Sequence, residues 1–250
     1  MAYLKIENVA IKGISACVPS NIEENIDLPV FEEGEAQRVI NQTGIAKKHV
    51  VTQGITALDL CKVAMEKLLN ELKWEKESID VVMFVSTTFD HIIPPNSCIL
   101  QGMLGLPEDT MCVDLRQGCP GWTIGMTTLS SLLSNGCVKR GILLVGDTPT
   151  LSHSPLDKET RPLFGDAGTA TALEFDETVN PIEFYHGTRG KDYKSIFAES
   201  GGYRNMTDEE ALKYVEYGKN IQRRRIDVVM DGMSVFGFGL SMGPKSVNNL

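Results

Sequence analysis

The residues "MCVDLRQGCPGWTIG", numbers 111–125, combine a strand, a sharp turn and the start of a helix. The apolar run at 111–115 is typical of a strand buried in a sheet. Cys119 follows it between two glycines, with Pro120 directly after it. Proline is favoured at the first position of a helix, because its missing N–H would have no helical partner there. We therefore predict a strand, a tight turn at Cys119 and then a helix whose end is marked by Gly136.

A thiol at the first turn of a helix has a particular electrostatic setting. The first N–H groups of a helix lack internal partners and carry partial positive charge, so they stabilise an anion. Such a position favours the reactive thiolate form of a cysteine. The alternative is a structural cysteine beside an ordinary turn, which is our interpretation of the remaining cysteines. The coincidence of strand, glycine, cysteine, proline and glycine at 114–122 favours Cys119 as a nucleophile.

A helix is predicted over residues 55–73, "ITALDLCKVAMEKLLNELK", where apolar residues recur with helical spacing. Thr56 and Asp59 suit its N-terminal cap, since a threonine followed three residues later by an acidic residue satisfies the first free N–H groups. The predicted buried stripe of this helix comprises Leu60, Val63, Ala64, Leu68 and Leu72.

Further strands and helices alternate along the chain. A short helix fits residues 96–106, ahead of Pro107. Continuous apolar runs are the signature of strands buried on both faces. Besides 111–115, such runs occupy 80–87, 141–146 and 167–175. Strands separated by helices predict an α/β fold with a mostly parallel sheet covered on both faces.

The composition limits the functional classes. The chain has 250 residues, 42% of them hydrophobic, and a formal net charge of −9. This acidity argues against nucleic-acid or anionic-membrane partners, which require a basic face. No stretch approaches the roughly 20 apolar residues of a membrane span, and the N-terminus lacks the apolar core of a signal peptide. We therefore expect a cytoplasmic location.

Metal and disulfide sites are also not expected. The six cysteines are scattered, with no Cys-x-x-Cys spacing and no nearby histidine pairing. A chain of this length with a normal core needs no disulfide framework, so reduced thiols are the default.

The pattern weakens beyond residue 180. Residues 187–206 are glycine-rich and loop-like, and 207–220 is compatible with a helix. The last stretch, 227–250, starts an apolar run and a helix. A compact domain rarely ends on an apolar element with nothing after it to cover it. We therefore expect the chain to be an N-terminal piece of a longer protein.

Several short motifs, in a consistent order over nearly the whole chain, resemble the 3-oxoacyl-[acyl-carrier-protein] synthase III family, condensing enzymes of the thiolase fold. The matching segments are NQTGIAKKH (41–49), STTFDHIIPPNSCILQGMLGL (86–106), DLRQGCPGW (114–122), LFGDAGTATAL (163–173), GTRGKDYKSIF (187–197) with GGYR (201–204), and MDGMSVFGF (230–238). The resemblance implies an α/β thiolase-like fold. Its N-terminal half, residues 1–178, is expected to be complete, and the second half, residues 179–250, to be truncated.

The resemblance also implies an activity. Cys119 would accept an acyl group from a coenzyme A or carrier-protein thioester, and malonyl-carrier protein would then lose carbon dioxide and condense with it. The acyl thioester is a substrate, and no separate cofactor is implied. The family uses a histidine from a His-Gln-Ala-Asn segment and an asparagine from a Gly-Asn-Thr-Ser segment for condensation, and neither segment occurs in this sequence. We expect acylation at Cys119 without condensation.

Three positions depart from the family pattern. Where members that use acetyl-coenzyme A carry a tryptophan and an arginine to hold the nucleotide, this chain has Arg38 and Gln42. The loss of the aromatic face favours a carrier-protein donor, with acyl-coenzyme A as the alternative. The phenylalanine that limits acyl length from across the dimer is replaced by Ile93, which predicts either a different pocket depth or simple packing.

An acidic carrier protein would need a local basic patch on this acidic chain. The candidates are Lys47 and Lys48, Lys139 and Arg140, and Arg223 to Arg225. For any one of these groups, ordinary solvated surface is the simpler interpretation.

Two other functional classes remain open. The chain could be a non-catalytic partner subunit that shapes the pocket of another synthase, although such a subunit needs no nucleophile. It could also be a thiolase-fold enzyme that forms esters or amides. The resemblance implies a homodimer, with 141–149 and the loop at Ile93 as candidate interface segments.

Overall fold

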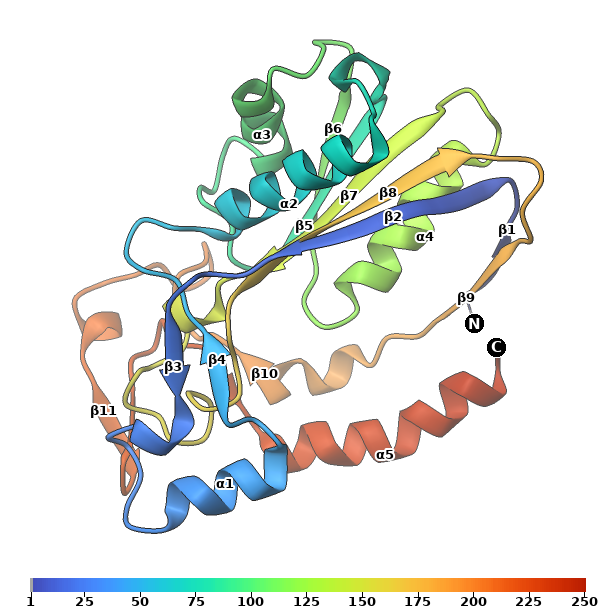
Figure 1. The fold of residues 1–250 in the computed structure, drawn as a ribbon. Helices are drawn as coiled ribbons and strands as arrows, with labels where there is room; N and C mark the ends of the chain where they lie inside the picture. The colour runs from blue at the N-terminus through green and yellow to red at the C-terminus, as the bar shows by residue number, and fades with distance from the viewer. Residues whose placement is uncertain (1) are drawn as a thin grey trace.

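A mixed five-stranded sheet forms the centre of the computed structural model, which describes residues 2–250 (Figure 1). Its strands follow the order β2-β8-β7-β5-β6. Their bounds are β2 Val9–Cys17, β8 Ala167–Phe175, β7 Arg140–Asp147, β5 Val81–Ser86 and β6 Met111–Arg116. The strands predicted at 80–87, 111–115, 141–146 and 167–175 are therefore confirmed.

The prediction of a mostly parallel sheet is wrong. Strand β5 pairs in parallel with β6 and β7, but β8 pairs antiparallel with both β7 and β2. The apolar pattern did not single out β2, because its register with β8 shifts between Ile11 and Gly13. This irregularity breaks the period-two alternation by which a strand is recognised. Ile11 and Ile14 are exposed.

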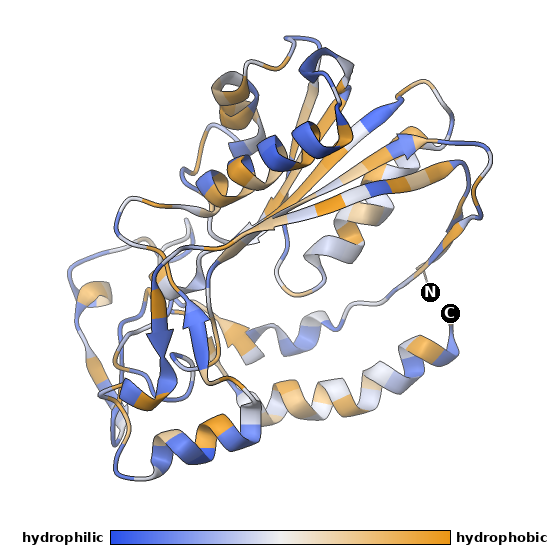
Figure 2. Cartoon of the chain, viewed as in Figure 1, coloured by the Kyte–Doolittle hydropathy of each residue, from blue (hydrophilic) through white to orange (hydrophobic). Residues whose placement is uncertain are grey.

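Helices cover both faces of the sheet (Figure 1). Helix α2 (Ala57–Leu72) and α3 (Asn96–Leu104) pack on one face, and α4 (Gly121–Leu133) packs on the other. Because successive strand residues point to opposite faces, Val82 and Phe84 enter the first core while Val81 and Met83 enter the second. Figure 2 shows the corresponding apolar colouring of the central strands.

Helix α2 begins with the predicted cap. Thr56 and Asp59 form a reciprocal capping box, in which the Thr56 N–H donates to the Asp59 carboxylate at 3.0 Å. The predicted buried stripe contains one error, because Val63 is 49% exposed. Cys61 and Met65 are buried in the core instead. Apolar residues occupy more than one face of this helix, so spacing alone does not decide which of them meets the sheet.

Four two-stranded ribbons surround the central sheet. They pair β1 (Ala2–Ile6) with β9 (Ile182–His186), β3 (Ile22–Glu24) with β4 (Lys47–His49), β10 (Ile196–Phe197) with β13 (Val229–Met230), and β11 (Val215–Gly218) with β12 (Ile221–Arg223). The domain boundary predicted at residue 178 falls in the connection between β8 and β9 and remains a prediction.

The helix considered for 207–220 is not formed. A single 3₁₀ turn, Glu210–Leu212, is followed by the β11–β12 hairpin. Asn220 lies in the hairpin turn with a φ of 61°, a conformation that asparagine tolerates better than most residues. Val215 and Tyr217 alternate with polar neighbours, which is the spacing of a strand, and both side chains are exposed.

Two helices lie away from the central sheet (Figure 1). Helix α1 covers Glu35–Thr43, and α5 covers Gly232–Asn248. The helix start predicted near the end of the chain is confirmed, and the Asp231 carboxylate accepts from the Ser234 N–H at 3.0 Å to cap it. None of the residues of α5 is buried.

The contact between α4 and the sheet can be tested with Gly125→Ala. A methyl group on Gly125 would lie 2.5 Å from Leu143 Cδ1, and because Leu143 is fully buried its side chain would have to shift within a packed core. We expect the free energy of unfolding to fall by about 1–3 kcal/mol in urea denaturation.

Gly102→Ala is the matched control, since Gly102 is also helical but has open space around its Cα. Alanine is the better helix former, so this change should stabilise by up to about 1 kcal/mol. Stabilisation by both substitutions would contradict the close packing of α4.

Candidate functional site

The turn that carries Cys119 joins β6 to α4. The Gly121 N–H donates to the Gly118 carbonyl at 2.8 Å, which closes the turn with Cys119 and Pro120 at its centre. Pro120 directly precedes the first helical residue, and its carbonyl accepts from the Ile124 N–H at 2.9 Å. Cys119 is exposed. The structure therefore places this thiol at the strand–turn–helix junction that the sequence predicts.

Small residues hold this junction against the sheet. A methyl group on Gly121 would lie 2.9 Å from Val85 Cγ1, so α4 starts in direct contact with the end of β5. The parallel strands β5, β6 and β7 all end at the same edge of the sheet. Ligands of open α/β sheets bind outside the carboxyl ends of the strands. Cys119 lies at that edge.

The Asp147 carboxylate fastens two strand ends beside this turn. Its Oδ1 accepts from the N–H groups of Thr87 and Thr88 at 2.7 and 3.1 Å, and from the hydroxyls of Ser86, Thr87 and Thr88 at 2.9, 2.9 and 3.1 Å. Thr87 also lies next to the turn, because a methyl group on Gly118 would be 3.6 Å from its Cγ2. The sequence analysis missed Asp147, although an acidic residue that ends one strand and hydroxyls that end another were a usable signal.

Asp114, from the stretch that leads to Cys119, fixes the start of α3. Its two carboxylate oxygens accept from the Asn96 and Ser97 N–H groups at 2.7 and 2.9 Å. These are the first amides of α3, which have no partners within the helix. The negative charge also complements the helix dipole. Strand β6 thereby holds α3 on one side of the sheet and leads into α4 on the other.

The cysteines differ in burial, and burial changes the reactivity of a thiol. Cys61 is fully buried, and burial raises the pKa of its thiol to about 12. Cys112 is half-buried, and burial together with the nearby Cys98 thiol raises its pKa to about 11. Both therefore remain protonated at neutral pH. Cys119 combines exposure with the helix start behind it, which is the setting that nucleophilic chemistry requires.

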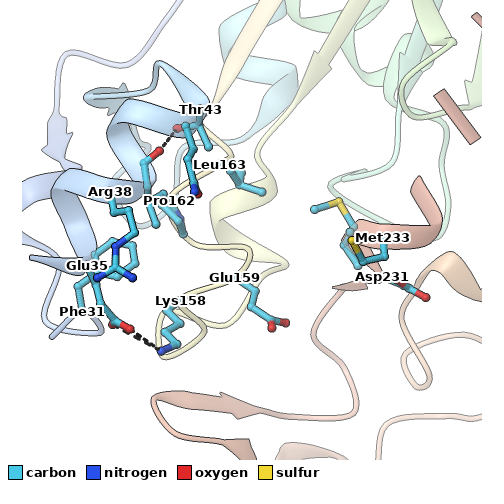
Figure 3. A pocket seen from close by; sticks show the side chains of 14 residues that line it. Phe31, Glu35, Arg38, Thr43, Lys158, Glu159, Pro162, Leu163, Asp231 and Met233 are labelled. Carbon is cyan, nitrogen blue, oxygen red and sulfur yellow. Dashed lines mark hydrogen bonds and ion pairs between the residues drawn. The ribbon is translucent and has the colours of Figure 1, made fainter. Parts of the chain in front are cut away.

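Arg38 and Gln42 line a groove of about 720 Å³ between α1, the loop at 158–163 and the start of α5 (Figure 3). Lys158 crosses this groove and pairs with Glu35 at 3.1 Å. The lining also includes Met233.

The predicted site residues fall in separate places. Arg38 and Gln42 are brought together one helical turn apart on α1, but neither Cys119 nor Ile93 lines the groove. Ile93 is 80% exposed and lies in the loop between β5 and α3. Within this chain, Ile93 therefore does not occupy a buried packing position.

Several cations of the predicted basic patches pair with acidic neighbours. Lys48 is buried and pairs with Glu23. Arg140 pairs with Glu174 at 2.7 Å and lies over Trp74.

The third candidate patch is likewise paired. Arg223 pairs with Asp157 at 2.7 Å, Arg224 with Asp227 at 2.7 Å, and Arg225 with Asp208 at 3.1 Å. These cations serve mainly to join segments of the chain.

Comparisons with known proteins agree on one family. A family model described as 3-oxoacyl-[acyl-carrier-protein (ACP)] synthase III matches residues 113–190, which include Cys119 and Asp147. The crystal structure of a 3-oxoacyl-(acyl-carrier protein) synthase from Burkholderia xenovorans LB400 is similar with a TM-score of 0.90 and 32% identity, covering 99% of this chain and 70% of that one.

Two further relatives are similar over comparable lengths. A crystal structure of a 3-oxoacyl-(acyl-carrier-protein) synthase III has a TM-score of 0.88 and 26% identity, covering 97% of this chain and 73% of that one. The beta-ketoacyl-[acyl-carrier-protein] synthase III of Fusobacterium nucleatum is 27% identical over 241 residues, covering 96% of this chain and 70% of the relative.

Thiol alkylation tests the geometry of the site. With iodoacetamide on the native protein, we expect Cys119 to react at least about 100-fold faster than Cys61, because the Cys61 thiol is buried and protonated. Peptide mass mapping over time gives both rates. In urea the two rates should converge, which provides the internal control. Equal rates in the native protein would contradict the burial of Cys61 or the exposure of Cys119.

Proposed function

Because the chain belongs to the 3-oxoacyl-[acyl-carrier-protein] synthase III family, we propose that it is an acyltransferase in which Cys119 accepts an acyl group from a thioester. The observation that carries this proposal is the exposed thiol at the start of α4, at the carboxyl edge of three parallel strands. Gly118, Cys119 and Pro120 are all exposed, which supports access to the thiol by an acyl thioester.

The proposed step is a transfer between two sulfur atoms. The Cys119 thiolate attacks the carbonyl carbon of the donor thioester, a new carbon–sulfur bond forms, and the carbon–sulfur bond to the donor breaks. The donor leaves as a thiolate that takes up a proton from solvent. Forming the acyl-cysteine divides carbon–carbon bond formation into two easier steps. Cys119 precedes α4 by two residues, so the positive end of the helix dipole faces the attacking sulfur.

The condensation step would need donors aimed at the malonyl thioester oxygen. The sequence contains neither of the family's histidine and asparagine segments. Two of its histidines have structural partners: His153 stacks on Phe164, and His186 bonds to the Thr127 hydroxyl at 2.8 Å. We therefore assign acylation, and not condensation, to these 250 residues.

The carrier-protein donor is proposed because Arg38 stands where relatives that use acetyl-coenzyme A have a tryptophan. The charges of the Arg38 groove do not decide between the donors. Lys158 pairs with Glu35 at 3.1 Å and Glu159 pairs with Arg223 at 2.6 Å, which leaves Arg38 and Asp231 as the remaining charges of the lining.

The homodimer implied by the resemblance remains a proposal. Of the two candidate interface segments, 141–147 belongs to β7, between β5 and β8 in the sheet, and residues 148–149 lie beyond the strand. The exposed loop at Ile93 remains available for such a contact.

Acyl transfer to Cys119 can be measured directly. The protein is incubated with a carrier protein whose acyl group is radiolabelled. The position of the transferred label is then located by peptide mapping. We expect the label on Cys119 and a loss of at least about 100-fold in Cys119→Ala. Cys137→Ala, which removes another exposed cysteine, should retain full labelling. Label on other residues only would refute the nucleophile and favour a non-catalytic partner subunit.

The same assay separates the donors. With equal concentrations of acyl-carrier protein and acyl-coenzyme A, we expect the carrier protein to label Cys119 at least about fivefold faster, because Arg38 replaces the tryptophan whose ring would stack on adenine. Faster labelling by acyl-coenzyme A would contradict the choice of donor while leaving the Cys119 assignment intact.

Condensation provides a separate prediction. After acylation, addition of malonyl-carrier protein should give no 3-oxoacyl product above the no-enzyme control, since the residues that stabilise the developing enolate are not in this sequence. Product analysis by mass spectrometry is the measurement. A 3-oxoacyl product that disappears in Cys119→Ala would show that other residues of the chain perform this role.

A further inference from the structure

A second groove, of about 870 Å³, lies beside the β10–β13 pair and carries an excess of cations. Its volume is within the range of small-molecule sites. Neither Cys119 nor any residue of the Arg38 groove lines it. The cations of its lining are Lys194, Arg204, Arg223, Arg224 and Arg225, against the carboxylates of Glu199 and Asp227. This is a local basic cavity on a chain whose formal net charge is −9.

Two of these cations are already matched by carboxylates of the chain. Arg223 donates to the carboxylates of Asp157 and Glu159 at 2.7 and 2.6 Å. Arg224 donates to the Asp227 carboxylate at 2.7 Å. Both arginines therefore join segments of the chain, and we assign no ligand to them.

The other three cations keep most of their charge free. Lys194 and Arg204 are exposed, and neither forms an ion pair with another of the described residues. Arg225 donates through Nη2 to Asp208 at 3.1 Å, but the Asp208 side chain is 60% exposed, and such a surface pair is weak. The Arg225 Nε is buried and has no hydrogen-bond partner. Glu199 is the one carboxylate of the lining that remains to oppose these three.

The backbone holds two of the free cations on neighbouring segments. Asn205 closes the loop that carries Arg204, because its Nδ2 donates to the Glu199 carbonyl at 3.0 Å and its carbonyl accepts from the Gly201 N–H at 2.9 Å. The Ser200 N–H of the same loop donates to the Arg225 carbonyl at 2.9 Å. The loop is thereby fastened to the segment of Arg225. Such fixed groups lose less conformational freedom when a ligand binds.

The remainder of the lining is partly apolar. Phe197 and Val229 are paired across β10 and β13, and both line the groove. The Tyr193 ring meets the Phe197 ring edge-on, with 5.9 Å between their centroids. Apolar walls lower the local dielectric, so each free cation attracts an anion more strongly here than on an open surface.

We propose that this groove binds a phosphate-bearing small molecule through Arg204, Arg225 and Lys194. The planar guanidinium of arginine matches two oxygens of a phosphate group, and lysine adds a compact positive charge. Three free cations against one carboxylate suit a ligand with two or more negative charges. The site does not depend on the proposed function, because none of its residues takes part in acyl transfer to Cys119.

The full chain titrated with inorganic pyrophosphate, followed by ³¹P nuclear magnetic resonance, tests the site. We expect a Kd of about 1 mM or tighter at low salt, and weaker binding as sodium chloride screens the charges. Arg204→Gln and Lys194→Gln should each weaken binding at least about threefold. Neither side chain has an ion pair within the described chain, so both variants should unfold at the temperature of the parent protein.

Two further substitutions give this charge dependence its sign. Glu199→Gln removes the opposing carboxylate of the lining and should tighten pyrophosphate binding at least about twofold. Lys191→Gln is the matched control, since Lys191 shares the 3₁₀ turn Gly190–Ser195 with Lys194 but does not line the groove. It should change the Kd by less than about twofold.

Three results would overturn the proposal: a pyrophosphate signal that excess protein leaves unchanged at low salt, equal weakening by Lys191→Gln and Lys194→Gln, or unaltered binding in an Arg204→Gln protein that unfolds like the parent. The titration does not use the Cys119 thiol. Its failure would leave the acyl-transfer proposal intact, and a failure to acylate Cys119 would leave this site intact.

Discussion

The close approach of α4 to the sheet is the constraint on which the proposed site depends. Gly121 and Gly125 present bare backbone to Val85 and Leu143, and a single methyl group at either position would collide with a buried side chain. Because the helix lies this near, the chain leaving β6 must turn within a few residues. The turn carries Cys119 at its tip, at the edge where three parallel strands end. Packing in the core thus decides where the thiol meets solvent.

Carboxylates that accept from backbone amides fix the surroundings of this turn. Asp114 holds the start of α3, and Asp147 joins the ends of β5 and β7. Asp166 accepts from the Val51 and Thr150 amides at 2.7 and 3.1 Å and so ties two further loops together. Loop amides cannot find partners in a sheet, and an ionised acceptor gives them a strong one. Part of the acidic charge of the chain is therefore structural.

The sequence was sufficient wherever one strong local signal determined the structure. Continuous apolar runs located four strands of the central sheet, and Thr56 with Asp59 located the start of α2. The position of Cys119 at a strand–helix turn followed from its glycine and proline neighbours.

Sequence-based prediction failed where contacts between distant segments determine the structure. The bulge in β2, the exposure of Val63 and the pairing of Arg223 with Asp157 all depend on what the tertiary fold places beside them.

The cysteines show why spacing in sequence is a poor guide to thiol chemistry. Cys61 and Cys119 are both isolated along the chain, yet one is sealed beneath α2 and the other faces solvent at a helix start. Cys112 is isolated in the same way, and its half-buried position on β6 raises the pKa of its thiol to about 11. A strand alternates its side chains between two faces, so β6 supplies Asp114 and Cys112 to one layer and then leads through Cys119 into the other. One strand therefore positions two different kinds of thiol, and the face to which each belongs determines its chemistry.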